Sequence, residues 1–259
     1  MIQSSRGGDI VRCDVHSLPV SPRPEWPKMG AMEANLVAGV LTIGQAPRHD
    51  GLSADVARVA GLQVIERGAL DDLTREEISA LGPRPGGELL VSQLADGTPV
   101  RLDPNAILEP LQRAILALED EGVAATLLLC TGEFPRFAHS RPLLVPSSAL
   151  RGVVSGIAGE GRLASMIPLQ EQTEEARCWW QKGGVSDPIL VAADPYGRDA
   201  EAEVERQARC AGQLGGAVLF LDCFGYTLRM AELARAAFGG PVVLARSLAA
   251  RLLAELAGA

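Results

Sequence analysis

The sequence predicts an α/β protein made of two lobes, each built on a mostly parallel sheet. Strand-like and helix-like segments alternate along the chain, which is typical of parallel sheets with helices on both faces. The strands read as continuous Val, Leu and Ile runs, as expected for strands that are buried on both faces. A similar segment also occurs twice, as LLLC-TG at 127–132 and LFLDC-FG at 219–225. The repeat predicts two similar lobes that face each other across one cleft.

The first half of the regular pattern begins at residue 36 with LVAGVLTIG, an apolar run that ends in glycine. Acidic residues in DDLTREEISAL favour a helix start, because the positive end of the helix dipole attracts them. Apolar residues spaced three or four apart predict the helix that ends at Gly122. We expect strands at 36–44, 63–67, 124–130 and 142–146, two short strands around a turn at Asp96-Gly97, and helices at 55–62, 71–81, 104–122 and 147–159.

The second half repeats the alternation and ends with the strand PVVLARS. We expect strands at 162–169, 187–197, 217–223 and 241–247, and helices at 171–184, 198–216 and 227–240. The first lobe is predicted to comprise 36–157 plus 246–259, and the second 158–245. Residues 1–35 contain four prolines and no sustained apolar period, so we expect a disordered tail or a misassigned start.

Composition limits the partners. The net charge of −8 argues against nucleic acid and anionic membranes, which both select basic surfaces. No apolar run approaches the ~18 residues of a membrane span. The five cysteines are widely spaced and odd in number, which indicates reduced thiols in the cytoplasm rather than a disulfide framework. No zinc spacing, GxGxxG or phosphate loop occurs, so we expect no metal and no cofactor. The oligomeric state is open, with a homodimer as one expectation.

Two cysteines stand at strand ends, where the crevice of an open parallel sheet lies. A thiol has a pKa near 8.5 that its surroundings can bring close to 7, and its thiolate can remove a proton from carbon. One thiolate and one opposed thiol would invert a carbon centre. Cys130 and Cys223 fit this requirement, although a free cysteine is often a small packing residue. Cys178 and Cys210 lie in helical stretches and are expected to pack, and Cys13 lies in the tail.

Five segments together resemble the AroM family, within the aspartate/glutamate/hydantoin racemase superfamily. They are TIGQAPR (42–48), the ERG-LDDLTREEI stretch (66–78), LLLCTGEF (127–134), IPLQEQ (167–172) and LFLDCFGY (219–226). The resemblance covers the chain from about residue 36 to its end. It implies two Rossmann-like lobes related by pseudo-two-fold symmetry, with a small carboxylate bound in the cleft between them and no cofactor.

The resemblance also implies roles for particular residues. Cys130 and Cys223 would be the opposed acid and base, and Thr131 and Gly132 would hold the substrate carboxylate. The loop after the first strand would line the cleft through Thr42, Gly44 and Gln45. The chain departs from glutamate racemases at two places: Thr42 replaces an aspartate, and Cys223-Phe224-Gly225 replaces Cys-Thr-His. Asp222 is expected to face the loop amides, because an inward carboxylate would raise the thiol pKa.

Further candidates follow strand ends and could reach the crevice. They are Arg48, Gln170, Gly225, Tyr226 and Thr227, with His49 and Gln172 beside two of them. Arginine pairs with carboxylates, so Arg48 is either an anion ligand or an exposed loop residue. Thr227 either binds ligand or caps the next helix. His139 either closes the cleft or lies in a solvated loop, and Glu133 is either an amine partner or a first-turn helix charge.

These observations predict a cofactor-independent racemase or isomerase that moves an α-proton of a small carboxylate, such as an amino acid. A decarboxylase is an alternative, because a single cysteine could protonate the carbanion left by lost CO2. A non-catalytic small-molecule-binding protein is another, because two groups that tune the thiols in glutamate racemases are missing. A Gly-x-Ser-x-Gly hydrolase motif is absent.

Overall fold

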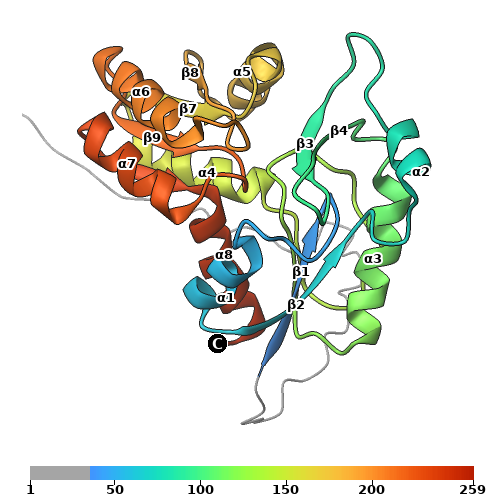
Figure 1. The fold of residues 1–259 in the computed structure, drawn as a ribbon. Coiled ribbons are helices and arrows are strands. Elements are labelled where there is room, and N and C mark those ends of the chain that lie inside the picture. The colour runs from blue at the N-terminus through green and yellow to red at the C-terminus, as the bar shows by residue number, and fades with distance from the viewer. Residues whose placement is uncertain (1–35) are drawn as a thin grey trace, which may run out of the picture. The chain divides into compact units, whose positions relative to one another are not determined.

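The computed structural model describes residues 36–259 (Figure 1). The expected tail at 1–35, with Cys13, lies outside the described residues. The strands form two four-stranded sheets and one antiparallel pair. The first sheet has the order β2 (Gln63–Gly68), β1 (Val37–Thr42), β5 (Thr126–Leu128), β6 (Leu143–Leu144); the second has β10 (Val242–Leu244), β9 (Val218–Leu221), β7 (Leu163–Ile167), β8 (Ile189–Ala192); β3 (Leu90–Gln93) pairs with β4 (Pro99–Leu102).

Both four-stranded sheets are parallel throughout and share one strand order. Numbered within its own sheet, each has its second, first, third and fourth strands side by side. The predicted α/β class with mostly parallel sheets is therefore confirmed. In this strand order, the connections that follow the first and third strands run to opposite edges of the sheet. A crevice therefore forms at the carboxyl ends of these two strands, and ligands bind in such crevices.

Helices cover the sheets on both faces. They are α1 (Leu52–Ala60), α2 (Arg75–Ala80), α3 (Leu108–Asp120), α4 (Ser147–Ala158), α5 (Thr173–Lys182), α6 (Ala200–Gln213), α7 (Leu228–Phe238) and α8 (Ala245–Ala257). One apolar cluster joins α1, α4 and α8 to strands of both sheets. A second packs α6 and α7 on β7, β8 and β9, and a third packs α3 on β1, β5 and the β3–β4 pair.

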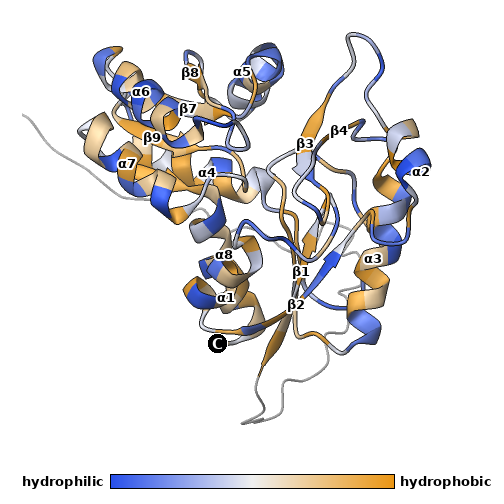
Figure 2. Cartoon of the chain, in the orientation of Figure 1, coloured by the Kyte–Doolittle hydropathy of each residue, from blue (hydrophilic) through white to orange (hydrophobic). Residues whose placement is uncertain are grey.

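Successive residues of a strand point to opposite faces, and the clusters follow that period. In β9, Val218 and Phe220 join the first cluster, whereas Leu219 and Leu221 join the second. The strands of the second sheet are largely hydrophobic in Figure 2, as this two-sided burial requires. Because α4 and α8 contact both sheets, the lobe boundaries at 157/158 and 245/246 stay a prediction.

The C-terminal end differs from the expectation. The strand predicted at 241–247 stops at Leu244, and α8 begins at Ala245. The pattern of α8 is helical, because Ala245, Ala249, Leu253 and Ala257 recur every four residues and are all buried. The strand predicted at 36–44 likewise stops at Thr42. None of the described helices combines the length and apolar character of a membrane span.

Candidate active site

Two matched turns carry the cysteines. Each follows the third strand of its sheet, and each has the form Cys-X-Gly. The amide of Gly132 donates to Sγ of Cys130 at 3.4 Å, and the amide of Gly225 donates to Sγ of Cys223 at 3.3 Å. The hydroxyl of Thr131 donates to the carbonyl of Asp222 at 3.2 Å, so the two turns are directly joined. The sequence repeat is thus a repeat in geometry.

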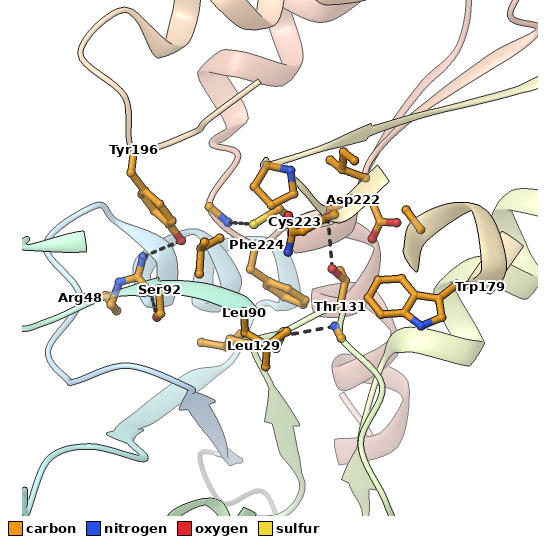
Figure 3. Close-up of a pocket in the computed structure, with 18 residues that line it drawn as sticks. Arg48, Leu90, Ser92, Leu129, Thr131, Trp179, Tyr196, Asp222, Cys223 and Phe224 are labelled. Atoms are coloured by element: carbon orange, nitrogen blue, oxygen red, sulfur yellow. Dashed lines mark hydrogen bonds between the residues drawn. The ribbon is translucent and has the colours of Figure 1, made fainter. Parts of the chain in front are cut away.

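Both turns line one small cavity, of about 40 Å³ (Figure 3). Cys130 and Cys223 are 9% and 8% exposed, and both line this cavity. Its other walls come from loops that follow strands of both sheets, from β3 and from α5. They include Arg48, Ser92, Pro168, Gln172, Trp179, Tyr196 and Asp222. The cavity is larger than a single water needs but far smaller than the several hundred Å³ of a drug-sized site.

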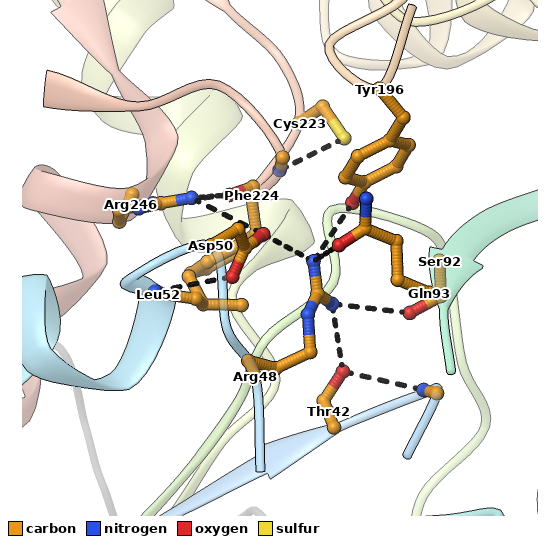
Figure 4. Close-up of polar contacts among 12 residues, drawn as sticks. Thr42, Arg48, Asp50, Leu52, Ser92, Gln93, Tyr196, Cys223, Phe224 and Arg246 are labelled. Carbon is orange, nitrogen blue, oxygen red and sulfur yellow. Dashed lines mark hydrogen bonds and ion pairs between the residues drawn. The ribbon is translucent and has the colours of Figure 1, made fainter. Parts of the chain in front are cut away.

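Arg48 is the centre of a polar network beside Cys223 (Figure 4). Its guanidinium donates to Thr42 Oγ1 at 3.2 Å and Ser92 Oγ at 3.3 Å. It pairs with Asp50 at 2.5 Å, and it reaches the hydroxyl of Tyr196, on the loop after β8, at 3.4 Å. Among the described residues, its buried Nε has no hydrogen-bond partner. Arg48 therefore brings a positive charge to the cavity and links loops that belong to the two sheets.

Burial favours the protonated form of both thiols. Burial raises the pKa of Cys130 to about 12 and that of Cys223 to about 12, although the amides of Gly132 and Gly225 pull in the opposite direction. This direction is opposite to the shift toward 7 that we expected from the surroundings of the thiols. Desolvation of a thiolate in an apolar cleft outweighs one amide hydrogen bond.

Asp222 faces inward, contrary to the prediction that it would face the loop amides. Its carboxylate lines the cavity, and Ser165 Oγ lies 3.4 Å from Oδ2 in donor geometry. Burial raises its own pKa, and its charge raises the pKa of both cysteines. The positive charge of Arg151 lowers the pKa of Asp222 and so opposes part of the effect of burial.

The structure brings half of the predicted site residues to the cavity wall. These are Cys130, Cys223, Arg48, Thr131, Gly132 and Gly225. Thr42 is not among the lining residues, but its hydroxyl accepts a hydrogen bond from Arg48. Gln170 is exposed and its amide donates to Thr173, whereas Gln172, two residues on, lines the cavity.

Four other predicted residues have structural contacts instead. Gln45 donates to the carbonyl of Leu70 and accepts from the amide of Ala95. The hydroxyl of the fully buried Tyr226 lies 2.7 Å from the carbonyl of Ala193. Thr227 caps α7 by accepting from Met230, which is the alternative that the sequence left open. A side chain at Gly44 would collide with the β3 backbone, so this position needs glycine for close packing.

Sequence reasoning missed three cavity-lining residues whose side chains carry a polar group. Tyr196 lies in the DPYG turn after β8, so the strand-end rule that selected Arg48 could have found it. Ser92 and Trp179 lie inside β3 and α5, where no local signal marks a site. In the described part of the chain, no three His, Cys, Asp or Glu side chains are placed to hold a metal ion.

The family model described as AroM protein matches residues 38–257. The chain belongs to the AroM family. The matched range contains both Cys-X-Gly turns and the Arg48 loop, so the site lies within the part that is typical of AroM proteins. No curated protein matches the AroM chain significantly by sequence.

Solved structures of three kinds share the AroM chain's fold. Picrophilus torridus aspartate racemase is 13% identical with a TM-score of 0.58, covering 86% of this chain and 94% of its own. Unliganded arylmalonate decarboxylase is 17% identical with a TM-score of 0.57, covering 86% and 93%. Allantoin racemase from Klebsiella pneumoniae is 14% identical with a TM-score of 0.56, covering 86% and 88%. The AroM chain therefore shares its fold with these two racemases and this decarboxylase.

Proposed function

We propose that this AroM-family chain is a cofactor-independent racemase or isomerase that moves the α-proton of a small carboxylate between Cys130 and Cys223. The observation that carries the proposal is that two thiols, from matched turns of two similar sheets, line one cavity. Two proton carriers from opposite parts of a fold are what inversion at carbon requires. The names of the solved structures with this fold, two racemases and a decarboxylase, are consistent with the same class of chemistry.

The proposed step is a pair of proton transfers. One cysteine, as thiolate, takes the α-proton: the C–H bond breaks, an S–H bond forms, and the electron pair moves into the carboxylate. The other thiol then breaks its S–H bond and delivers a proton to the opposite face. The product is the mirror image, and the thiolate has moved from one cysteine to the other. A second turnover in reverse, or proton exchange with water, restores the starting state.

The high pKa of the thiols fits this work in one respect. An α-proton of a carboxylate is very weakly acidic, and a thiolate with a high pKa is a stronger base toward it. The cost is that few molecules carry a thiolate at neutral pH. We therefore expect kcat/KM to rise with pH between about pH 7 and 10, by roughly tenfold per unit, and to fall only when both thiols ionise. A flat profile over this range would contradict the mechanism.

The cavity indicates the kind of substrate. Its small size favours a compact molecule, and Arg48 offers a cation on the Cys223 side. A guanidinium attracts carboxylates, and Nε of Arg48 has no hydrogen-bond partner among the described residues, so we assign Arg48 to the substrate carboxylate. Amino acids, hydroxy acids and hydantoins that fit this description form the first panel to test.

A decarboxylase is the second candidate, and the protonation of both thiols favours it. Loss of CO2 leaves an electron pair on carbon, and a neutral thiol can supply the proton: the S–H bond breaks, a C–H bond forms, and water later reprotonates the thiolate. This reaction needs one thiol and no thiolate base. A malonate-type dicarboxylate would then be the substrate class.

Proton NMR in D2O tests both candidates. The panel, with arylmalonates added, is incubated with the protein and with its Cys130→Ser, Cys223→Ser and Cys178→Ser forms. The last is the matched control, because Cys178 is exposed. For a racemase, the α-proton signal disappears with the parent protein and the control but not with either active-site variant. For a decarboxylase, CO2 is released and one of the two serine variants stays active.

If folded protein exchanges no proton and releases no CO2 with any compound, both enzyme proposals are contradicted for this panel. Ligand-induced shifts that survive in the Cys130→Ser/Cys223→Ser double variant would instead identify a non-catalytic binding protein with the same cleft.

A further inference from the structure

A buried arginine donates hydrogen bonds to the backbone of each cysteine turn. Nη2 of Arg151 donates to the carbonyl of Thr131 at 3.1 Å. Nε and Nη2 of Arg246 donate to the carbonyl of Phe224 at 3.1 and 2.7 Å. Thr131 and Phe224 are the middle residues of the two Cys-X-Gly turns. In both turns, an arginine therefore contacts the peptide that lies between X and Gly.

The same peptide also carries the amide that contacts the sulfur. In a trans peptide the C=O and N–H bonds point in opposite directions. An arginine that fixes the carbonyl of X therefore aims the N–H of Gly at the cysteine. The two chains of contact are Arg151 to Thr131–Gly132 to Cys130, and Arg246 to Phe224–Gly225 to Cys223. Hydrogen bonds in such chains polarise one another, so the cation strengthens the amide as a donor.

The two arginines also have matching places in the fold. Arg151 lies in α4, which follows β6, and β6 is the neighbour of the Cys130 strand, β5. Arg246 lies in α8, which follows β10, and β10 is the neighbour of the Cys223 strand, β9. The arginine contact therefore occurs at the same place in each of the two similar sheets. Two independent copies of one arrangement argue against a chance contact.

Both guanidinium groups are deeply buried and paired. The side chain of Arg151 is 7% exposed, pairs with Glu133 at 2.9 Å and lies over the ring of Trp179 at 4.6 Å. The side chain of Arg246 is fully buried and pairs with Asp55 at 2.7 Å. Burying a cation is costly unless it gains partners, so these positions are built for charge.

We propose that Arg151 and Arg246 are matched positioning residues, each of which holds one cysteine turn and favours the thiolate of that cysteine alone. The inference rests on the proposed function in taking the thiols as proton carriers. Neither arginine is among the residues that line the cavity, so each acts through its peptide and its charge rather than by touching substrate.

Other charged and titratable groups also act on the pKa of each thiol, and they are the same in every variant of the test below. Cys130 is influenced by Cys223, Asp222 and Arg151, and Cys223 by Asp222, Arg48 and Arg246, with Tyr196 and Tyr226 close to Cys223. Glu133 and Glu175 act on the Arg151 side, and Asp50 and Asp55 on the Arg246 side. Only the arginine differs between each variant below and the parent protein, and the other cysteine is its internal control.

Site-resolved alkylation of the full chain tests the inference without any substrate. Iodoacetamide reacts with the thiolate, and mass spectrometry of the peptides reports each cysteine separately between about pH 8 and 11. We expect Arg246→Gln to slow the alkylation of Cys223 by roughly tenfold at a given pH, which corresponds to about one pKa unit. The alkylation rate of Cys130 should stay within about twofold of the parent value. Arg151→Gln should slow the alkylation of Cys130 and leave the alkylation rate of Cys223 unchanged.

The sign of the change separates this role from a merely structural one. A turn that simply loosens exposes its cysteine and speeds its alkylation. Faster alkylation, or equal changes at both cysteines, would overturn the inference. If a glutamine variant does not fold, as judged by circular dichroism, the lysine variant replaces it: Arg246→Lys keeps the charge but loses the two-point contact, and selective slowing of Cys223 by a smaller factor is still required.

The outcome is also separable from the proposed function. Selective slowing in a protein that exchanges no α-proton would support the positioning role and contradict the racemase. Proton exchange in a protein whose two cysteines respond alike would do the reverse.

Discussion

At the scale of single residues, the environment decides what each cysteine can do. Cys130 and Cys223 are buried at strand ends with an amide on each sulfur, whereas Cys178 is exposed on α5. Asp222 is a charged residue that acts on both buried thiols. It is buried next to Cys223 in the chain, and its charge raises the pKa of both thiols.

Asp222→Asn tests this coupling. The variant keeps the shape of the side chain but removes its negative charge, so we expect both thiols to ionise at lower pH. Alkylation of Cys130 and of Cys223 should each quicken several-fold at about pH 9, which corresponds to a drop in pKa of roughly one unit or less. An unchanged rate at both cysteines would mean that Asp222 is uncharged in the folded protein over this range.

Gly225 shows how closely the turns approach the opposing loop. A Cβ built there would lie 2.7 Å from the hydroxyl of Tyr196 and 2.7 Å from Cγ of Pro195. We expect Gly225→Ala to lower the free energy of unfolding by about 1 to 3 kcal/mol, measured by urea denaturation, because overpacking forces neighbours apart.

Gly152→Ala is the matched control for that substitution. Gly152 lies inside α4, and a Cβ there meets nothing within 4 Å. Alanine in a helix interior is favoured over glycine by roughly 0.5 to 1 kcal/mol, so this variant should gain stability. If both variants lost stability equally, steric contact at Gly225 would not be the cause.

At the scale of elements, the carboxyl ends of strands deliver the site, and the helices that follow fix the loops. β5 and β9 deliver the cysteines, the loop after β1 delivers Arg48, and the loop after β8 delivers Tyr196. α7 begins directly after the Cys223 turn, with Thr227 as its cap. The polar residues just beyond a strand end therefore divide between the cavity and the helix caps.

Thr227→Ala tests that division. The hydroxyl accepts from the amide of Met230 at 3.1 Å, and its loss should cost about 1 kcal/mol of unfolding free energy. Thr227→Ser keeps the hydroxyl and should restore most of the stability. Because the cap is not among the cavity-lining residues, KM for any substrate found should stay within about twofold. A large rise in KM in Thr227→Ala, absent from Thr227→Ser, would instead indicate ligand contact.

At the scale of the whole molecule, two sheets of identical strand order share the layer of α1, α4 and α8 and bury their cysteines in one cleft. Burying two thiols couples the stability of the fold to pH. Burial raises the pKa of each thiol to about 12 in the folded protein, well above the roughly 8.5 of an exposed thiol. The folded state therefore holds these protons more tightly than the unfolded chain does.

The expected consequence is loss of stability in alkali. The contribution of the thiols is fully present below about pH 9 and is lost as the pH rises toward about 12, because ionisation then costs more in the folded state. Urea denaturation at about pH 7.5, 9 and 10.5 should show the free energy of unfolding falling more steeply than in the Cys130→Ser/Cys223→Ser variant. The tyrosines titrate in both proteins, so the difference isolates the thiols. Parallel curves would contradict the raised values.

The sequence by itself determined the alternation of strands and helices, the parallel class, and the two turns that carry Cys130 and Cys223. These follow from local patterns: apolar runs, helical spacing and a repeated segment. It missed α8, because the strand β10 runs into the helix without a break residue. Three features became visible only in the folded chain: Asp222 lines the cavity, Tyr226 bonds backbone carbonyls, and Arg151 and Arg246 bond the two cysteine turns. Such facts depend on contacts between residues far apart in the chain and on the desolvation of the cleft, and neither is encoded in local spacing.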